Sequence, residues 1–137
     1  MSFKQALVLY GITLGIFFLI DMIWLGLVAK GFYRRHLGGF LSPDVRWGAA
    51  LLFYLLFTAG LLVFVIRPAL LRGAPLEALF FGALFGLICY ATYDLSNMAT
   101  LKSRPLIVTV VDLVWGTALG GAVSFLSVVI GRAWLKL

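Results

Sequence analysis

A chain of 137 residues that is 64% hydrophobic and only 12% charged lies well outside the range of soluble globular domains. Its mean hydropathy of +1.12 indicates a membrane protein. The net charge of +6 does not indicate a nucleic-acid partner, because lysine and arginine are scattered over loops and helix ends, where membrane proteins carry anchors for lipid phosphates.

Four apolar stretches are each long enough to cross a bilayer core, which takes roughly 20 helical residues. Because they use nearly the whole chain and the connections are short, neighbouring helices should pack antiparallel. We therefore predict an all-α fold, an integral membrane four-helix bundle with both termini on the same side, in which residues 1–137 form a single transmembrane domain. The predicted helices cover about residues 5–29, 47–66, 78–101 and 106–131.

The segments outside these helices carry signals of their own. The first helix is too long for a cleavable signal peptide, contains Asp21 and is followed by LVAKGFY, so we expect it to stay attached. Residues 30–46 mix aromatic and basic side chains, which fits either a short interfacial helix or a flexible basic loop. Arg67–Pro75 reads as a turn closed by proline and glycine, and Pro105 suits the first turn of the last helix.

Three aspartates lie at one predicted depth. Counted from the membrane side that carries residues 30–46, Asp21 is eight residues deep in its helix, and Asp94 and Asp112 are each seven deep. At about 1.5 Å per residue all three carboxyl groups lie about 10–12 Å inside that face. Tyr54 of the second helix is also seven residues in, so every helix contributes a polar group to one layer.

Residue spacing predicts that Asp94 and Asp112 face the inside of the bundle. Each continues a repeat of glycines four residues apart, and such small-residue stripes are where transmembrane helices approach one another closely. The glycines are Gly82 and Gly86 before Asp94, and Gly116 and Gly120 after Asp112.

The first helix has a less regular pattern. Gly11 and Gly15 lie about a third of a turn away from the line through Phe17 and Asp21. A weak internal echo links this helix to the last one, because both carry Asp-x-x-Trp followed by glycine.

The acids need an explanation, since an ionised aspartate at mid-span costs about 2.5–3.5 kcal/mol and the predicted spans contain no lysine, arginine or histidine. They can be protonated, bind a cation or a basic ligand, or line a wet pocket. Because like charges held close together are unfavourable, we predict that at least one of the three is neutral at pH 7. Their neighbours can donate hydrogen bonds, and the candidate binding residues are Asp21, Asp94, Asp112, Asn97, Tyr90, Tyr54, Trp24 and Trp115.

Several kinds of chemistry are excluded by composition. The one histidine, His36, lies in a loop, which rules out a histidine-rich metal oxygenase and leaves haem without a helical ligand. Cys89 is the only cysteine and falls inside a span, so no disulfide or cysteine metal site can form within the chain. We expect no cofactor and no metal site.

Three segments resemble a family of small bacterial predicted membrane proteins catalogued as a domain of unknown function. They are YATYDLSNMATL (90–101), PLIVTVVDLVWGTALGG (105–121) and LIDMIWLGLVAKGFY (19–33). The resemblance covers nearly the whole chain and implies a four-helix integral membrane protein, which we expect in the bacterial inner (cytoplasmic) membrane as a multi-pass protein. It implies no catalytic residue. The two membrane sides carry five and six basic residues, so the sequence leaves the orientation open.

Three functional hypotheses follow. In the first, an intramembrane acidic pocket binds a proton, a small cation or a small amphiphile, in a role connected with transport. In the second, the chain is a non-catalytic accessory subunit of a larger membrane complex, and the acids act as interhelical bonds of about 0.6–2 kcal/mol each. The third, less favoured, is a lipid- or isoprenoid-modifying enzyme that uses acid–base carboxylates. Four helices make a thin wall, so we expect a homo-oligomer or a larger complex in the lipid bilayer.

Overall fold

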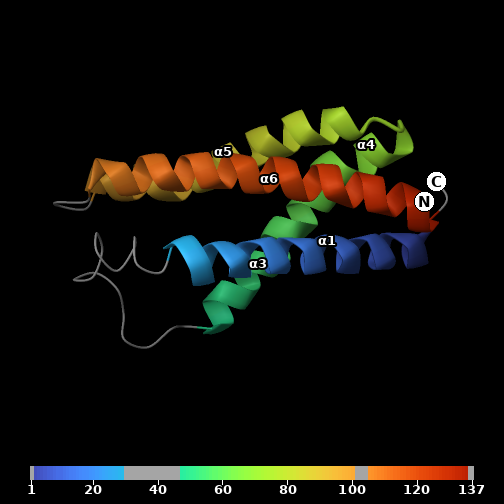
Figure 1. Cartoon of the computed structure of the whole chain (residues 1–137), viewed down its shortest axis with the longest axis horizontal. Coiled ribbons are helices and arrows are strands. Elements are labelled where there is room, and N and C mark those ends of the chain that lie inside the picture. Colours follow the sequence, from blue (N-terminus) through green and yellow to red (C-terminus); the bar gives the residue numbers. More distant parts are fainter. Residues whose placement is uncertain (1, 30–46, 101–104, 136–137) are drawn as a thin grey trace.

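The computed structural model describes residues 2–29, 47–100 and 105–135, and all of its regular structure is helical within these ranges. The possible interfacial helix within residues 30–46 lies outside them. The helical segments, in chain order, are α1 (Phe3–Ile23), η1 (Trp24–Ala29), α3 (Trp47–Leu61), η2 (Leu62–Ile66), α4 (Arg67–Leu71), α5 (Pro75–Thr100) and α6 (Leu106–Leu135). Figure 1 shows that α1, α5 and α6 run nearly along one axis while α3 crosses them at an angle.

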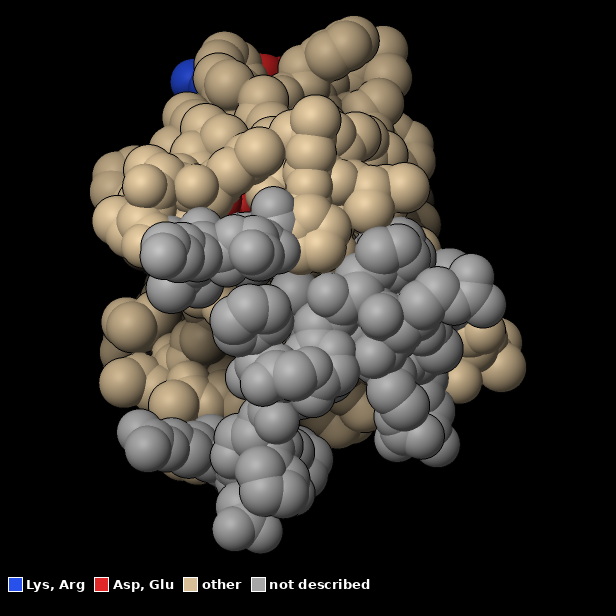
Figure 2. All heavy atoms as spheres, turned by 90° about the vertical axis from the view of Figure 1, so that its left-hand side faces the viewer, with Lys and Arg blue, Asp and Glu red and all other residues tan. Residues whose placement is uncertain are grey.

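Four of these helical runs are long and apolar enough to cross a membrane within the described residues: Phe3–Leu27, Gly48–Leu71, Pro75–Thr100 and Leu106–Leu135. The start of α1 and the end of α6 lie at the same end of the bundle (Figure 1). The predicted all-α membrane bundle is therefore confirmed. Its outer faces carry large apolar side chains, and Figure 2 shows almost no charge on the described surface of one end.

The second membrane-crossing run is longer than the sequence predicts. Arg67–Leu71 is helical, so the predicted turn over Arg67–Pro75 is wrong for its first five residues. The helix continues because η2 widens just before Pro68: the Arg67 N–H donates to the Leu62 carbonyl, five residues back. A π-helical turn accommodates a proline that can neither donate a backbone hydrogen bond nor tolerate the carbonyl four residues earlier.

The chain reverses after α4 at Gly73, whose φ of +64° is a conformation that favours glycine. The Ala74 N–H donates to the Ala69 carbonyl at 2.9 Å, as expected where a helix ends in a left-handed residue. Arg72 then pairs with Glu77 of α5 through two hydrogen bonds, and the hydrogen bonding and charge of this carboxylate raise the pKa of Arg72.

The closest helix pair is α5 with α6, and its contact consists of the predicted glycine stripes. A Cβ atom added to Gly86 would overlap the carbonyl oxygen of Gly116, and one added to Gly120 would overlap that of Gly82. The two backbones therefore touch, which brings the second half of α5 close to the first half of α6.

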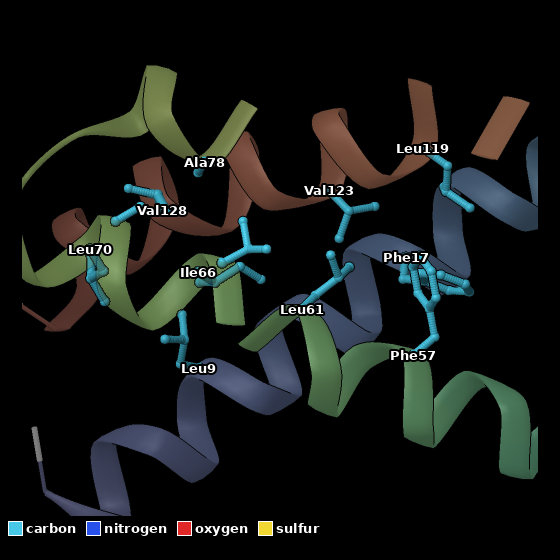
Figure 3. Packing of buried hydrophobic residues seen from close by; sticks show 12 residues of the cluster. Leu9, Phe17, Phe57, Leu61, Ile66, Leu70, Ala78, Leu119, Val123 and Val128 are labelled. Carbon is cyan, nitrogen blue, oxygen red and sulfur yellow. The ribbon is translucent and has the colours of Figure 1, made fainter. Parts of the chain in front are cut away.

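An apolar core joins all four membrane-crossing runs, with residues from α1, α3, η2, α4, α5 and α6 (Figure 3). The buried face of α1 is Leu9, Thr13, Phe17 and Asp21, spaced every four residues. In contrast, a Cβ atom added to Gly11 or Gly15 would meet nothing within 4 Å. Packing therefore selects the Phe17–Asp21 face of α1 and turns its glycines outward.

Candidate functional site

The second halves of the first and third membrane helices and the first halves of the other two surround a pocket of about 480 Å³. Every membrane-crossing run contributes to its wall. The lining residues are Asp21, Trp24 and Leu25 from α1 and η1, Phe53 and Tyr54 from α3, Cys89, Tyr90 and Tyr93 from α5, and Asp112 and Trp115 from α6.

Asp21 is held in place by a tyrosine of the neighbouring helix. The Tyr54 hydroxyl donates to Asp21 Oδ2 at 2.6 Å, within the range of hydrogen bonds to an ionised acceptor. Phe17, one turn before Asp21, packs edge-on against the Tyr54 ring with 5.1 Å between ring centroids. Asp21 is only 6% exposed, so this bond is a largely buried link between α1 and α3.

Two tryptophans form one side of the pocket. The indoles of Trp24 and Trp115 stack with centroids 4.3 Å apart and ring planes 10° from parallel. Each follows an aspartate by three residues, Asp21 on α1 and Asp112 on α6, and the stack brings the two Asp-x-x-Trp motifs together. Trp115 Nε1 is buried beside Asp21, yet it makes no hydrogen bond of good geometry to any residue that the structure describes.

The backbone changes its winding at this point. The π-helical segment η1 begins at Trp24, directly after the α-helical run that carries Asp21. Single π turns within α-helices occur frequently at functional sites, where they shift the side chains that follow relative to those before. Trp24 and Leu25, the first residues of η1, both line the pocket. Nothing in the sequence periodicity indicates this widening.

Six of the eight candidate residues line the pocket. They are Asp21, Asp112, Tyr54, Tyr90, Trp24 and Trp115. Asp94 is fully buried on the inward face of α5 and Asn97 is half-buried, but neither is part of the pocket wall. Within the described ranges, no three His, Cys, Asp or Glu side chains form a group that could hold a metal ion.

Four lining residues escape the sequence analysis. Leu25, Phe53, Cys89 and Tyr93 belong to the wall although nothing marks them as polar members of one layer. Cys89 and Tyr93 are four residues apart on α5 and flank Tyr90, so the helical repeat could have identified them once Tyr90 was placed. Phe53 and Leu25 could not be identified in this way, because their place in the wall depends on the crossing angle of α3 and on the winding of η1.

The rim of the pocket lies on the outer, apolar surface of the bundle. Leu25 is 39% exposed, Phe53 44% and Tyr93 64%, and all three belong to membrane-crossing runs. The pocket residues that are exposed on the described surface are therefore mainly aromatic or apolar. The arrangement suits binding of a molecule that has an apolar part and a polar part.

Comparison with known proteins identifies a family. No curated protein and no solved structure matches the chain. A family model described as "Predicted membrane protein (DUF2177)" matches residues 6–129, which include all ten residues of the pocket wall. The predicted resemblance is confirmed, and the chain belongs to this family of integral membrane proteins of unknown function.

Proposed function

We propose that this protein binds a small amphiphile that enters the pocket from the lipid of a bacterial inner membrane. The observation that carries the proposal is the combination of two buried carboxyl groups, Asp21 and Asp112, with walls that are otherwise mainly aromatic and open through an apolar rim. The polar part of the ligand would lie near the acids. Its chain would leave past Leu25 and Tyr93 into the bilayer.

The size of the pocket favours an amphiphile over a bare ion or a proton. A volume of about 480 Å³ falls within the roughly 300–1,000 Å³ typical of sites for small organic molecules. A calcium site gathers about six to eight oxygen ligands at about 2.3–2.6 Å, many of them from carboxylates, whereas only two carboxyl groups line this pocket and no three His, Cys, Asp or Glu side chains of the described residues form a group that could hold a metal ion.

Cys89 offers a direct test because it is the only cysteine in the chain and lines the pocket. In vesicles of phosphatidylethanolamine and phosphatidylglycerol, N-ethylmaleimide should alkylate this thiol. Dodecanol should slow the reaction about fivefold at a concentration of about four times its dissociation constant, since a filled pocket excludes the reagent. The measurement is the alkylation rate followed by mass spectrometry.

A matched control places the thiol on the outer face of the same helix. Leu84 is 49% exposed and lies outside the pocket wall, so a chain with Cys89→Ser and Leu84→Cys should react at a rate that dodecanol leaves unchanged. Equal slowing at both positions would mean a general membrane effect. That result, or no slowing at Cys89, would instead favour acids that only hold the helices together.

A further inference from the structure

The lining of the pocket also points to the chemistry of the ligand's polar part. Six of its ten residues are aromatic and two are acids. We propose that the bound head group is an organic cation, specifically an alkylated ammonium group. This inference rests on the proposed binding of an amphiphile and adds the class of its head.

Charge is the first argument. Asp21 and Asp112 come from different helices, α1 and α6, and both are at least nine-tenths buried where they meet the pocket. No lysine or arginine belongs to the wall, as far as the described residues form it. In a medium of low dielectric constant the field of carboxylates attracts a cation strongly and repels an anion equally strongly. A phosphate or carboxylate head would therefore be disfavoured.

The aromatic side chains are the second argument. Phe53, Tyr54 and Tyr90 lie close together, with Phe53 and Tyr90 ring centroids 6.3 Å apart in an edge-to-face arrangement. The Trp24–Trp115 stack forms another side of the same pocket. Rings of this kind attract a cation through their quadrupoles, and aromatic cages are known to recognise quaternary ammonium groups.

The mainly apolar surface of the wall favours an alkylated head over a primary ammonium. A primary ammonium has three N–H donors that need acceptors when buried. Asp21 Oδ2 already accepts from Tyr54, and most of the pocket wall is apolar surface that cannot accept from a buried N–H. Methyl groups on nitrogen need no acceptor and instead contact the rings of Trp24 and Tyr90. The head would then sit between the acids and the indole stack.

A series of amphiphiles with the same twelve-carbon chain and different heads tests this inference by protection of Cys89. Dodecyltrimethylammonium should half-protect the thiol at about a tenfold lower membrane concentration than the neutral dodecyl maltoside, the preference expected from charge and ring contacts together. Dodecyl phosphate should protect least. Dodecylphosphocholine carries the same trimethylammonium group next to a phosphate, as zwitterionic lipids do. If it protected Cys89 as well as dodecyltrimethylammonium, the natural ligand would be assigned to zwitterionic lipids rather than to free cationic amphiphiles.

Substitutions of the acids provide the second arm. Asp21→Asn and Asp112→Asn should each remove most of the preference for dodecyltrimethylammonium over dodecyl maltoside, measured as the ratio of the two half-protecting concentrations in the same variant. Glu77→Gln is the matched control, because this acid pairs with Arg72 outside the pocket wall. It should leave the whole series unchanged.

The outcomes separate this inference from the proposed function. Equal protection of Cys89 by the cation and by the maltoside overturns the cationic head but leaves amphiphile binding in place. Absence of protection by every member overturns both. If an aspartate variant fails to fold, the series on the unsubstituted chain decides the matter by itself.

Discussion

Gly86→Ala should force α5 away from α6 and lower the free energy of unfolding by about 2 kcal/mol. The added methyl group would overlap the backbone carbonyl of Gly116, which cannot rotate aside as a side chain can. Overpacking of this kind costs about 1–3 kcal/mol and sometimes more. The measurement is unfolding by titration with sodium dodecyl sulfate, followed by circular dichroism.

Gly15→Ala provides the matched control for this prediction. The same methyl group on α1 would meet nothing within 4 Å, so the variant should be as stable as the parent or more stable by about 0.5–1 kcal/mol through helix propensity. Equal destabilisation by both variants would contradict the account of the α5–α6 contact. The loss of this contact should also alter the pocket, because it places the side chain of Tyr90, a lining residue, against Gly116 of α6.

Tyr54→Phe should lower the free energy of unfolding by about 2 kcal/mol and loosen α3 at the pocket. The substitution keeps the ring that packs on Phe17 but leaves the buried Asp21 carboxylate without its phenol donor. A buried charged group that loses a hydrogen bond costs about 1.5–3 kcal/mol. The same titration measures the stability, and alkylation of Cys89 should become faster.

A second tyrosine bond between the same two helices serves as the control. The Tyr10 hydroxyl donates to the Leu55 carbonyl at 2.9 Å, an exposed bond to an uncharged acceptor. Tyr10→Phe should therefore cost no more than about 1 kcal/mol and leave the Cys89 rate unchanged. If Tyr10→Phe proved the more damaging of the two, the Tyr54–Asp21 link would not be the main tie between α1 and α3.

Much of the architecture follows from hydropathy alone. Four apolar runs of sufficient length permit few arrangements in a bilayer, where backbone groups must be satisfied within helices. The glycine stripes also marked the faces of α5 and α6 that pack closely, because small residues mark where membrane helices touch. The extension of the second run through Arg67–Leu71 was missed, since a proline ordinarily signals a helix end and the compensating turn η2 leaves no mark in the sequence.

The pocket was predictable in depth but not in rotation. Counting residues placed Asp21, Asp94 and Asp112 in one layer, and depth depends only on the rise per residue. The direction in which a side chain points around its helix is harder to predict, because each step of four residues turns the helix about 40° beyond a full circle. Asp94, two such steps beyond Gly86, is buried on α5 yet lies outside the wall, while Tyr90 lines it.

The contribution of the first helix could not be deduced from its glycines. Gly11 and Gly15 face outward because Leu9, Thr13 and Phe17 make the better contact with the core, a choice that depends on the shape of α3 and α6. Likewise, the stack of Trp24 on Trp115 requires both the antiparallel course of α1 and α6 and the π-helical turn at Trp24. Each arises from packing between segments distant in sequence.

The most direct test of an amphiphile pocket is anomalous diffraction from crystals grown in a lipidic mesophase with 2-bromododecan-1-ol, whose bromine lies beside its polar end. The account predicts a bromine peak between the Asp21 and Asp112 carboxyl groups, next to the Trp24–Trp115 stack. Bromine peaks confined to the outer faces of the bundle, with the pocket closed by the protein's own side chains, would contradict it.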